Sequence, residues 1–124
     1  MDESILGTIK NMLSGPVTDD DAPFDTELVV HVNSAIMVLR QAGVGPQNGY
    51  SIVGSDETWS DYLGDNESML ELVKSYIFLS VKNVFDPPSN GSVLQAYNNL
   101  MSEYIWRLRE QSDPANIFEV DDNA

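Results

Sequence analysis

The segment NESMLELVKSYIFLSVKNVF, residues 66–85, decides the fold because it is the most apolar stretch of the chain. Its apolar residues recur at helical spacing and widen into more than one face, which predicts a helix packed on several sides. Asp86-Pro87-Pro88 ends that helix, because proline cannot continue the hydrogen-bond ladder. We expect residues 66–85 to be the central helix, with one face formed by Leu70, Val73, Ile77, Val81 and Val84.

Three more long helices and one short helix follow from the same spacing and from end signals. The long helices are expected at residues 4–13, 22–42 and 93–111. The short helix is expected at residues 58–64, because Thr58 followed by Asp61 has the cap-then-acid spacing of a helix start. Residues 44–57 are rich in glycine turns and form a long loop between the second and third helices. The predicted fold is therefore all-α, a small helical bundle of four main helices plus one short helix.

Each of the other long helices is expected to bury one apolar stripe. In the helix at residues 4–13 the stripe is Ile5, Leu6, Ile9, Met12 and Leu13. In the helix at residues 22–42 it is Leu28, Val32, Ala35, Ile36 and Leu39, widened by Val29, Val30, Met37 and Val38. In the helix at residues 93–111 it is Val93, Tyr97, Leu100, Met101, Tyr104 and Leu108.

One domain accounts for the chain, because 124 residues with 42% hydrophobic residues suffice for a single core. Residues 1–112 contain all the predicted helices and form the helical domain. Residues 113–124 begin with the helix-breaking pair Asp113-Pro114 and form an acidic C-terminal tail that we expect to be flexible.

The charge of the chain argues against several classes of protein. Twenty Asp and Glu against six Lys and Arg give a formal net charge of −14, which repels phosphates and anionic membranes. The absence of Cys excludes disulfides, thiol catalysis and Cys-based zinc sites, and a single His leaves no histidine cluster. No segment approaches the roughly 20 apolar residues of a membrane span. Met1-Asp2-Glu3 lacks the basic start of a signal peptide, so we expect a protein that is intracellular when made and has no membrane partner.

Carboxylates are the only abundant reactive groups, and their spacing matches no specific site. A calcium-binding EF-hand loop beginning at Asp19 would need an oxygen ligand where Pro23 stands. Glu67 and Glu71 are one helical turn apart, as glycoside hydrolysis could use, but such pairs arise by composition in acidic helices. The sequence favours a protein with no catalytic residues, no metal and no cofactor. A small hydrolase using Glu67 and Glu71 is the less favoured alternative.

Large apolar residues outside the main stripes are the candidate interaction residues. Trp59 and Tyr62 lie beside Tyr50 near the long loop, where they either pack as a lid over the helix ends or anchor a partner protein. Trp106 makes the last helix apolar on two sides, which is more than a lone subunit covers easily. An apolar group in the tail either docks on a partner or belongs to a frayed end. The candidate interface residues are Tyr50, Trp59, Tyr62, Trp106, Ile117, Phe118 and Val120.

Several short motifs follow one another between Ile5 and Arg109. They are FDTEL (24–28) with HVN (31–33), LRQAGVG (39–45), TWSDYLG (58–64), LVKSYI (72–77), VFDPP (84–88) and EYIWR (103–107). Their order and spacing together resemble the small head–tail connector proteins, or head-completion adaptors, of long-tailed bacteriophages. The acidic tail matches no part of that pattern.

The resemblance implies a structural virion protein that forms a ring, typically of twelve copies, below the portal. Such a ring extends the DNA channel, through which DNA passes without specific binding, and offers a docking surface to the next connector or tail-completion protein. The implied location is the head–tail interface of the virion, after assembly in the host cytoplasm. We expect the last helix and the tail to contact the portal, and the region from Tyr50 to Tyr62 to contact neighbouring copies or the next ring.

An acidic DNA mimic that inhibits a host nucleic-acid-binding protein is the alternative function. It accounts for the size and the charge, but it explains neither the wide apolar arcs of the helices nor the order of the motifs. In a connector the charge has two explanations of its own. Acids lining the channel would keep DNA from sticking, or the acidity keeps free subunits soluble and apart before assembly.

Overall fold

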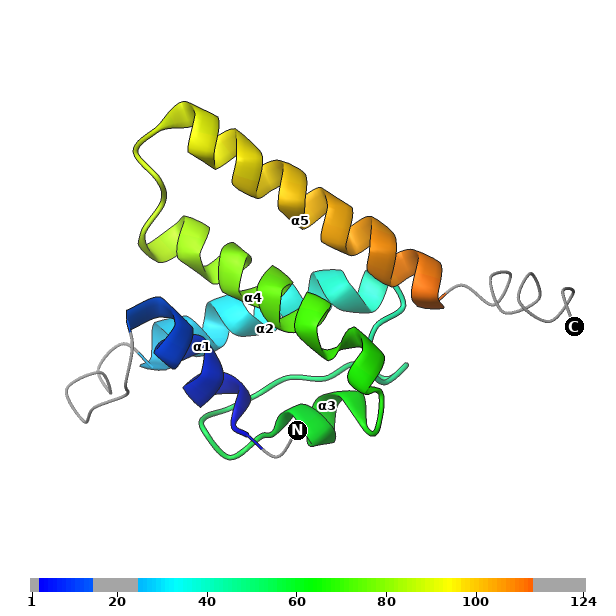
Figure 1. The fold of residues 1–124 in the computed structure, drawn as a ribbon. Coiled ribbons are helices and arrows are strands. Elements are labelled where there is room, and N and C mark those ends of the chain that lie inside the picture. The colour runs from blue at the N-terminus through cyan, green and yellow to red at the C-terminus, as the bar shows by residue number, and fades with distance from the viewer. Residues whose placement is uncertain (1–2, 15–24, 113–124) are drawn as a thin grey trace, which may run out of the picture.

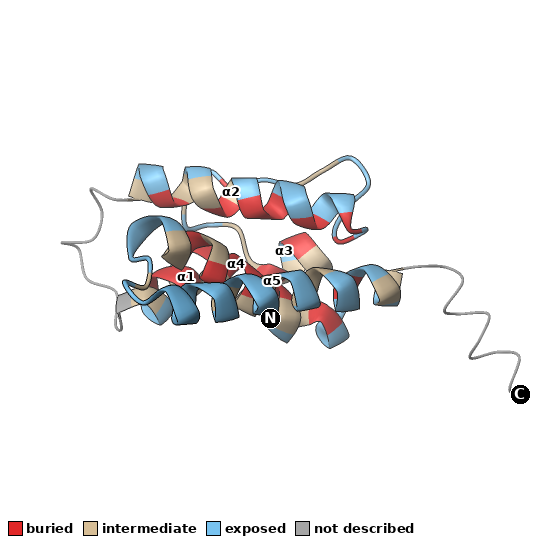
Figure 2. Ribbon diagram, turned by 90° about the horizontal axis from the view of Figure 1, so that it is seen from above, coloured by how far each residue is buried: buried red, intermediate tan, exposed pale blue. Residues whose placement is uncertain are grey.

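Helix α4 (Leu70–Phe85) is the element around which the other long helices pack (Figure 1). Val73, Ile77 and Val81 on this helix are completely buried. Figure 2 shows α2 and α5 on opposite sides of α4. The prediction that this apolar segment forms the central helix is therefore confirmed. The long helices that contact α4 are α1 (Ile5–Ser14), α2 (Asp25–Gln41) and α5 (Gly91–Ser112).

The computed structural model describes residues 3–14 and 25–112, and these residues confirm the predicted all-α fold. Between α2 and α4 lie the short helix α3 (Trp59–Leu63) and a 3₁₀ turn, η2 (Glu67–Met69). The described residues contain no β-strand beyond one isolated bridge between Ser4 and Thr58. The prediction of one continuous helix from residue 66 was wrong in detail, because its first turn closes with the tighter 3₁₀ hydrogen bond from Leu70 N–H to the Glu67 carbonyl.

The start of α1 is fixed to the start of α3. Ile5 N–H donates to the Glu57 carbonyl at 3.0 Å, and Trp59 N–H donates to the Glu3 carbonyl at 3.2 Å. The Trp59 ring is completely buried, and its Nε1–H donates to Thr8 Oγ1 at 3.0 Å. These bonds connect segments more than 50 residues apart in the chain, as the 51-residue separation of Thr8 and Trp59 shows.

Helix α3 begins with the predicted capping box. The Asp61 N–H donates to Thr58 Oγ1 at 3.1 Å, and the Thr58 N–H donates to the Asp61 carboxylate at 3.0 Å. Each side chain satisfies a backbone donor that a helix start leaves without an intrahelical partner. This short helix thereby has a defined start beside the long loop.

Hydrogen bonds from side chains of α2 hold the long loop before α3 in place. The Asn33 amide donates to the Ile52 carbonyl at 2.9 Å and accepts from the Ile52 N–H at 2.8 Å. Arg40 donates two hydrogen bonds to the Gln47 carbonyl, at 2.9 and 3.2 Å. Ile52 and Val44 are each only 1% exposed. The loop therefore completes the core, a role that the sequence analysis did not assign to it.

Two valines of α4 allow a matched test of this core. Val81→Ala removes two buried methyl groups, so we expect the free energy of unfolding in urea to fall by about 2 kcal/mol. Val84 is 53% exposed, so Val84→Ala should change it by less than about 0.5 kcal/mol. Equal losses of unfolding free energy in the two variants would contradict the burial of Val81 and the exposure of Val84 on α4.

Candidate assembly surfaces

The aromatic residues predicted near the long loop are placed mainly inside the subunit. Trp59 and Tyr62 are 0% and 2% exposed, so neither offers a surface to a partner in this subunit. Tyr50 is half-buried and stacks on Tyr62 with ring centroids 5.1 Å apart. This arrangement is the lid over the helix ends that the sequence left open as one of two possibilities. Apolar periodicity could not decide between them, because it does not report which side of a loop faces the core.

Close packing holds the Tyr62 ring against the loop backbone. Gly45 has a φ of +88°, and a Cβ built there would lie 2.7 Å from Tyr62 Cε1, so both the backbone conformation and the contact require glycine. The Tyr62 hydroxyl is buried without a hydrogen-bond partner among the described residues. Burial raises the pKa of this phenol far above its ordinary value of 10.0.

Trp106 on α5 is the aromatic candidate that the structure leaves on the surface. It is 60% exposed, in contrast to the fully buried Trp59. It lies two residues before Leu108, the buried residue of α5, and two residues turn a helix by about 200°. Trp106 therefore lies on the side of α5 opposite the core. Ile117, Phe118 and Val120 fall outside the described residues.

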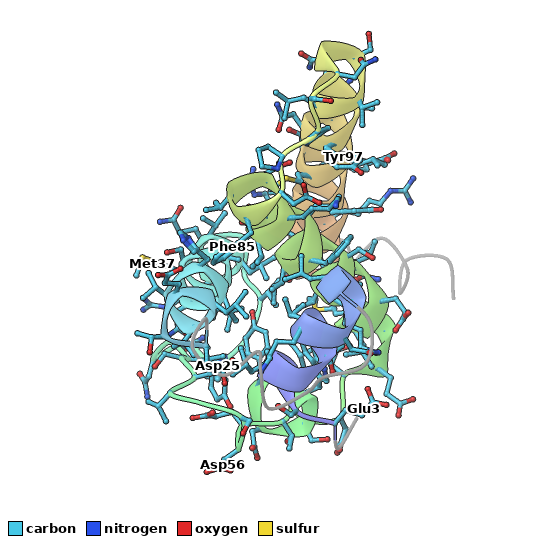
Figure 3. All side chains as sticks on the ribbon, turned by 90° about the vertical axis from the view of Figure 1, so that its left-hand side faces the viewer. Glu3, Asp25, Met37, Asp56, Phe85 and Tyr97 are labelled. Atoms are coloured by element: carbon cyan, nitrogen blue, oxygen red, sulfur yellow. The ribbon has the colours of Figure 1, made fainter. Side chains whose placement is uncertain are left out.

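The first half of α5 forms a second exposed apolar surface, which we call the α5 tip and define as Val93, Leu94, Tyr97 and Leu100. Three of these residues are 37–40% exposed, and Tyr97, labelled in Figure 3, is partly exposed. Predicting Val93 and Leu100 as buried was wrong, because α5 diverges from α4 and its first half extends beyond the bundle (Figure 1). No charged residue occurs from Pro87 to Ser102, so this tip is apolar and uncharged.

The side of α2 that faces away from α4 is a third such surface. We call it the α2 outer face and define it as Val30, Ser34, Met37 and Val38. Its three apolar residues are 55%, 63% and 41% exposed, and Figure 3 shows Met37 projecting outward. The prediction that Val30, Met37 and Val38 widen a covered stripe was wrong for the described part of the subunit, because these three side chains are exposed there.

The α2 outer face is continuous with the end of α4. The rings of His31 and Phe85 meet edge to face with centroids 5.3 Å apart, and Phe85 is itself 37% exposed. Val84 and Met12, both predicted in buried stripes, are also exposed, at 53% and 40%. Surface apolar residues are ordinary when single, but groups of them on one helix face mark sites of protein contact.

The charged side chains are distributed unevenly over the subunit. Four cations form ion pairs, namely Lys10–Asp25 at 2.7 Å, Lys74–Glu71 at 3.5 Å, Lys82–Asp86 at 3.2 Å and Arg107–Glu103 at 3.1 Å. The end of the molecule near α3 is acidic, and Figure 3 shows Glu3 and Asp56 there, at the opposite end from the α5 tip. Some of these acids have structural roles, since Glu57 accepts backbone hydrogen bonds from Val53 and Gly54.

The carboxylates do not assemble into a reaction site in the described part of the chain. Glu67 and Glu71 are both exposed, and Glu71 is paired with Lys74. An open hollow of about 570 Å³ beside α3 is lined in part by Asp61, whose carboxylate already caps that helix. Within residues 3–14 and 25–112 there is no group of three or more His, Asp or Glu that could hold a metal ion, and no helix suited to crossing a membrane.

A small all-α protein whose described residues leave three apolar surfaces exposed is typical of a component of a larger protein assembly. A family model described as phage connector protein matches residues 5–115, which is most of the chain. The chain therefore belongs to the phage connector protein family, as its motifs suggested, and this is a family of structural proteins. Neither a curated protein nor a solved structure matches it.

The unpartnered Tyr62 hydroxyl gives a test of the lid. Tyr62→Phe removes a buried polar group that makes no hydrogen bond, so we expect a gain of about 1 kcal/mol in unfolding free energy at neutral pH. Burial keeps the Tyr62 phenol neutral in the folded state, whereas in the unfolded state it ionises as the pH rises through 10.0. Ionisation of the unfolded state lowers the free energy of unfolding, so the stability of the wild type is unaffected by this group below pH 10.0 and falls as the pH rises further. The wild type should therefore lose more stability than Tyr62→Phe in urea titrations between about pH 8 and about pH 11. A variant with the same alkaline loss as the wild type would contradict this.

Proposed function

We propose that this protein is a head–tail connector that forms a closed ring below the portal of a phage head, extends the DNA channel and carries the next connector or tail-completion protein. The observation that supports it most is the apolar surface that the residues described by the structure leave exposed. Val30, Met37, Leu94, Leu100 and Trp106 lie on two helices on opposite sides of α4. A contact between two different surfaces of one subunit repeats from copy to copy and closes into a ring when the rotation allows.

The α5 tip is the surface that we assign to the portal. It extends beyond the rest of the bundle (Figure 1) and carries no charged residue. Depletion of charge with retained apolar area is typical of the core of a protein interface. A subunit of net charge −14 needs such a region to approach another protein without a desolvated acid in the contact.

The acidic end near α3 lies far from this tip and is suited to the DNA channel or to the solvent. Acids there repel the phosphate backbone, so DNA slides without long-lived contacts. The subunit would be made in the host cytoplasm and would take its final place at the head–tail interface of the virion. The ring would have twelve copies, as connectors of this kind typically do.

Negative-stain imaging of the purified protein, alone and mixed with the portal, tests the proposed function. We expect closed rings stacked coaxially on the portal. Monomers that ignore the portal and instead bind a basic host protein would contradict the proposal and favour an acidic DNA mimic.

Ionic strength should control the free ring. Copies that each carry −14 repel one another, and salt screens this repulsion, with a Debye length of roughly 30 Å at 0.01 M and 10 Å at 0.1 M. We therefore expect sedimentation velocity to show more ring at about 0.5 M than at about 0.05 M salt. Greater association at low salt would mean that attraction between opposite charges holds the copies together, contrary to this proposal.

The portal contact is tested by placing charge on the α5 tip. Leu94→Glu with Leu100→Glu should abolish co-sedimentation with the portal, because two carboxylates would be desolvated in the contact. Both positions are exposed at 37% and 39%, so the fold should persist, as circular dichroism would check. Met12→Glu, at an exposed methionine of α1, is the control and should bind as the wild type does. Undiminished binding by the double variant would remove the tip from the portal contact.

A further inference from the structure

We propose that residues 114–118 of the C-terminal tail dock in the open hollow beside α3 of their own subunit. The hollow lies where the end of α5, the end of α3 and the loop after α2 meet, and its volume is about 570 Å³. The inference goes beyond the proposed ring and does not depend on it. It replaces the expectation that Ile117 and Phe118, which fall outside the described residues, meet the portal.

The chain leaves α5 at the wall of this hollow. Gln111 and Ser112, the last two residues of α5, both line it. Ser112 packs closely on the loop after α2, because a Cβ built at Gly43 would lie 2.7 Å from the Ser112 Cβ. Asp113-Pro114 follows directly, and proline cannot continue the helix. The tail therefore starts beside the hollow.

The length of the chain after Ser112 suits the subunit's own hollow. Phe118 lies six residues after Ser112, and six extended residues span at most about 20 Å, enough to cross a hollow of this size. A short tether gives a segment an effective concentration of about a millimolar at a site within its reach. Even a weak site is then occupied, and a peptide of another molecule has to compete with the tail. This favours the subunit's own tail as the occupant.

The hollow and residues 114–118 have matching chemistry. Pro46, Leu63 and Met69 contribute apolar side chains to the lining. The tail segment Pro-Ala-Asn-Ile-Phe carries no charge and ends in two large apolar residues, whereas the acids of the tail lie outside it on both sides. Asp61, the charged residue of the lining, is exposed and already accepts the Thr58 N–H. The segment can therefore be buried without desolvating a charge.

Glycines leave backbone uncovered in the lining of the hollow. Gly43, Gly45 and Gly64 all line it and are exposed, and a Cβ built at Gly64 would meet no atom within 4 Å. A peptide approaches the backbone closely where no side chain intervenes. The N–H of Gly45 donates to no atom of the described residues, so it is available to a carbonyl of the tail.

Docking has a consequence for the α5 tip. Three acids follow Phe118 in the tail. Twelve free residues after Ser112 would span up to about 40 Å and reach the start of α5, which lies about 30 Å from Ser112 along a helix of 22 residues. With residues 114–118 docked, only the six residues after Phe118 remain free, and these span about 20 Å. Docking therefore keeps the acids of the tail away from the uncharged tip.

Disulfide trapping tests the docking directly, because the chain contains no cysteine. Phe118→Cys should form a disulfide with Asn66→Cys, an exposed position of the lining, about tenfold faster than with the matched control Ser102→Cys. Ser102 is exposed on α5 about 15 Å from Ser112, within reach of a free tail but outside the lining of the hollow. Equal rates for the two pairs would mean that the tail is free, and disulfides between copies on a non-reducing gel would mean that it docks on a neighbour. Either result would overturn the inference.

Hydrogen exchange gives a second readout on the full chain. Phe118→Asp places a charge in the docked segment, so amide exchange at residues 43–45 and 62–64 should rise about tenfold, while the amides of α4 keep their exchange rates. Asn123→Asp adds the same charge outside the segment and should exchange as the wild type does. Exchange that is the same in Phe118→Asp and Asn123→Asp would overturn the inference. Imaging with the portal reports on the ring separately, so the failure of one proposal is distinguishable from the failure of the other.

Discussion

The divergence of α5 from α4 is the constraint on which the rest of the structure depends. Asp86-Pro87-Pro88 cannot extend α4, and two successive prolines hold the backbone extended, so α5 begins at a distance from the end of α4 (Figure 1). The two helices are in contact from Met101, where the Asn83 amide donates to the Met101 sulfur at 3.4 Å, to Leu108, the buried residue of α5. The first half of α5 therefore stays outside the core of the described residues, and Val93, Leu94 and Leu100 are exposed there.

In contrast to the first half of α5, helix α4 is covered by neighbouring elements. α4 is covered by α1, α2 and α5, and the long loop seals one end of the core through Asn33 and Ile52. Folding thus produces a stable body with apolar residues left over on its sides. Groups of exposed apolar residues of this kind are typical of surfaces that contact other proteins.

The distribution of charged residues also separates the apolar surfaces from the rest of the molecule. Glu3 and Asp56 lie at the end of the molecule near α3, while the α5 tip and the α2 outer face contain no charged residue. In the proposed ring, long-range repulsion would keep free copies apart, and the uncharged surfaces would be the places where copies make close contact.

The sequence predicted the elements better than the surfaces. Helical spacing located α4, and the Thr58 and Asp61 pair located the start of α3, because both depend on neighbours along the chain. The burial of Ile52 could not be predicted, since it depends on the Asn33 amide, 19 residues away. Val84 and Leu100 have the same helical spacing as residues of the core. They are exposed because no other element packs against them in the described structure, which spacing along the chain cannot reveal. Trp106 was recognised because it falls outside the stripe of its own helix.

The central claim is that these apolar surfaces become buried when copies assemble on the portal. Hydroxyl-radical footprinting with mass spectrometry measures it directly, because methionine, tryptophan and leucine side chains are readily oxidised. The claim predicts that Met37, Trp106 and Leu94 lose most of their labelling on assembly, while Val53, which is 85% exposed in the long loop, keeps its labelling. Equal labelling of Met37, Trp106 and Leu94 in the free and assembled states would contradict it.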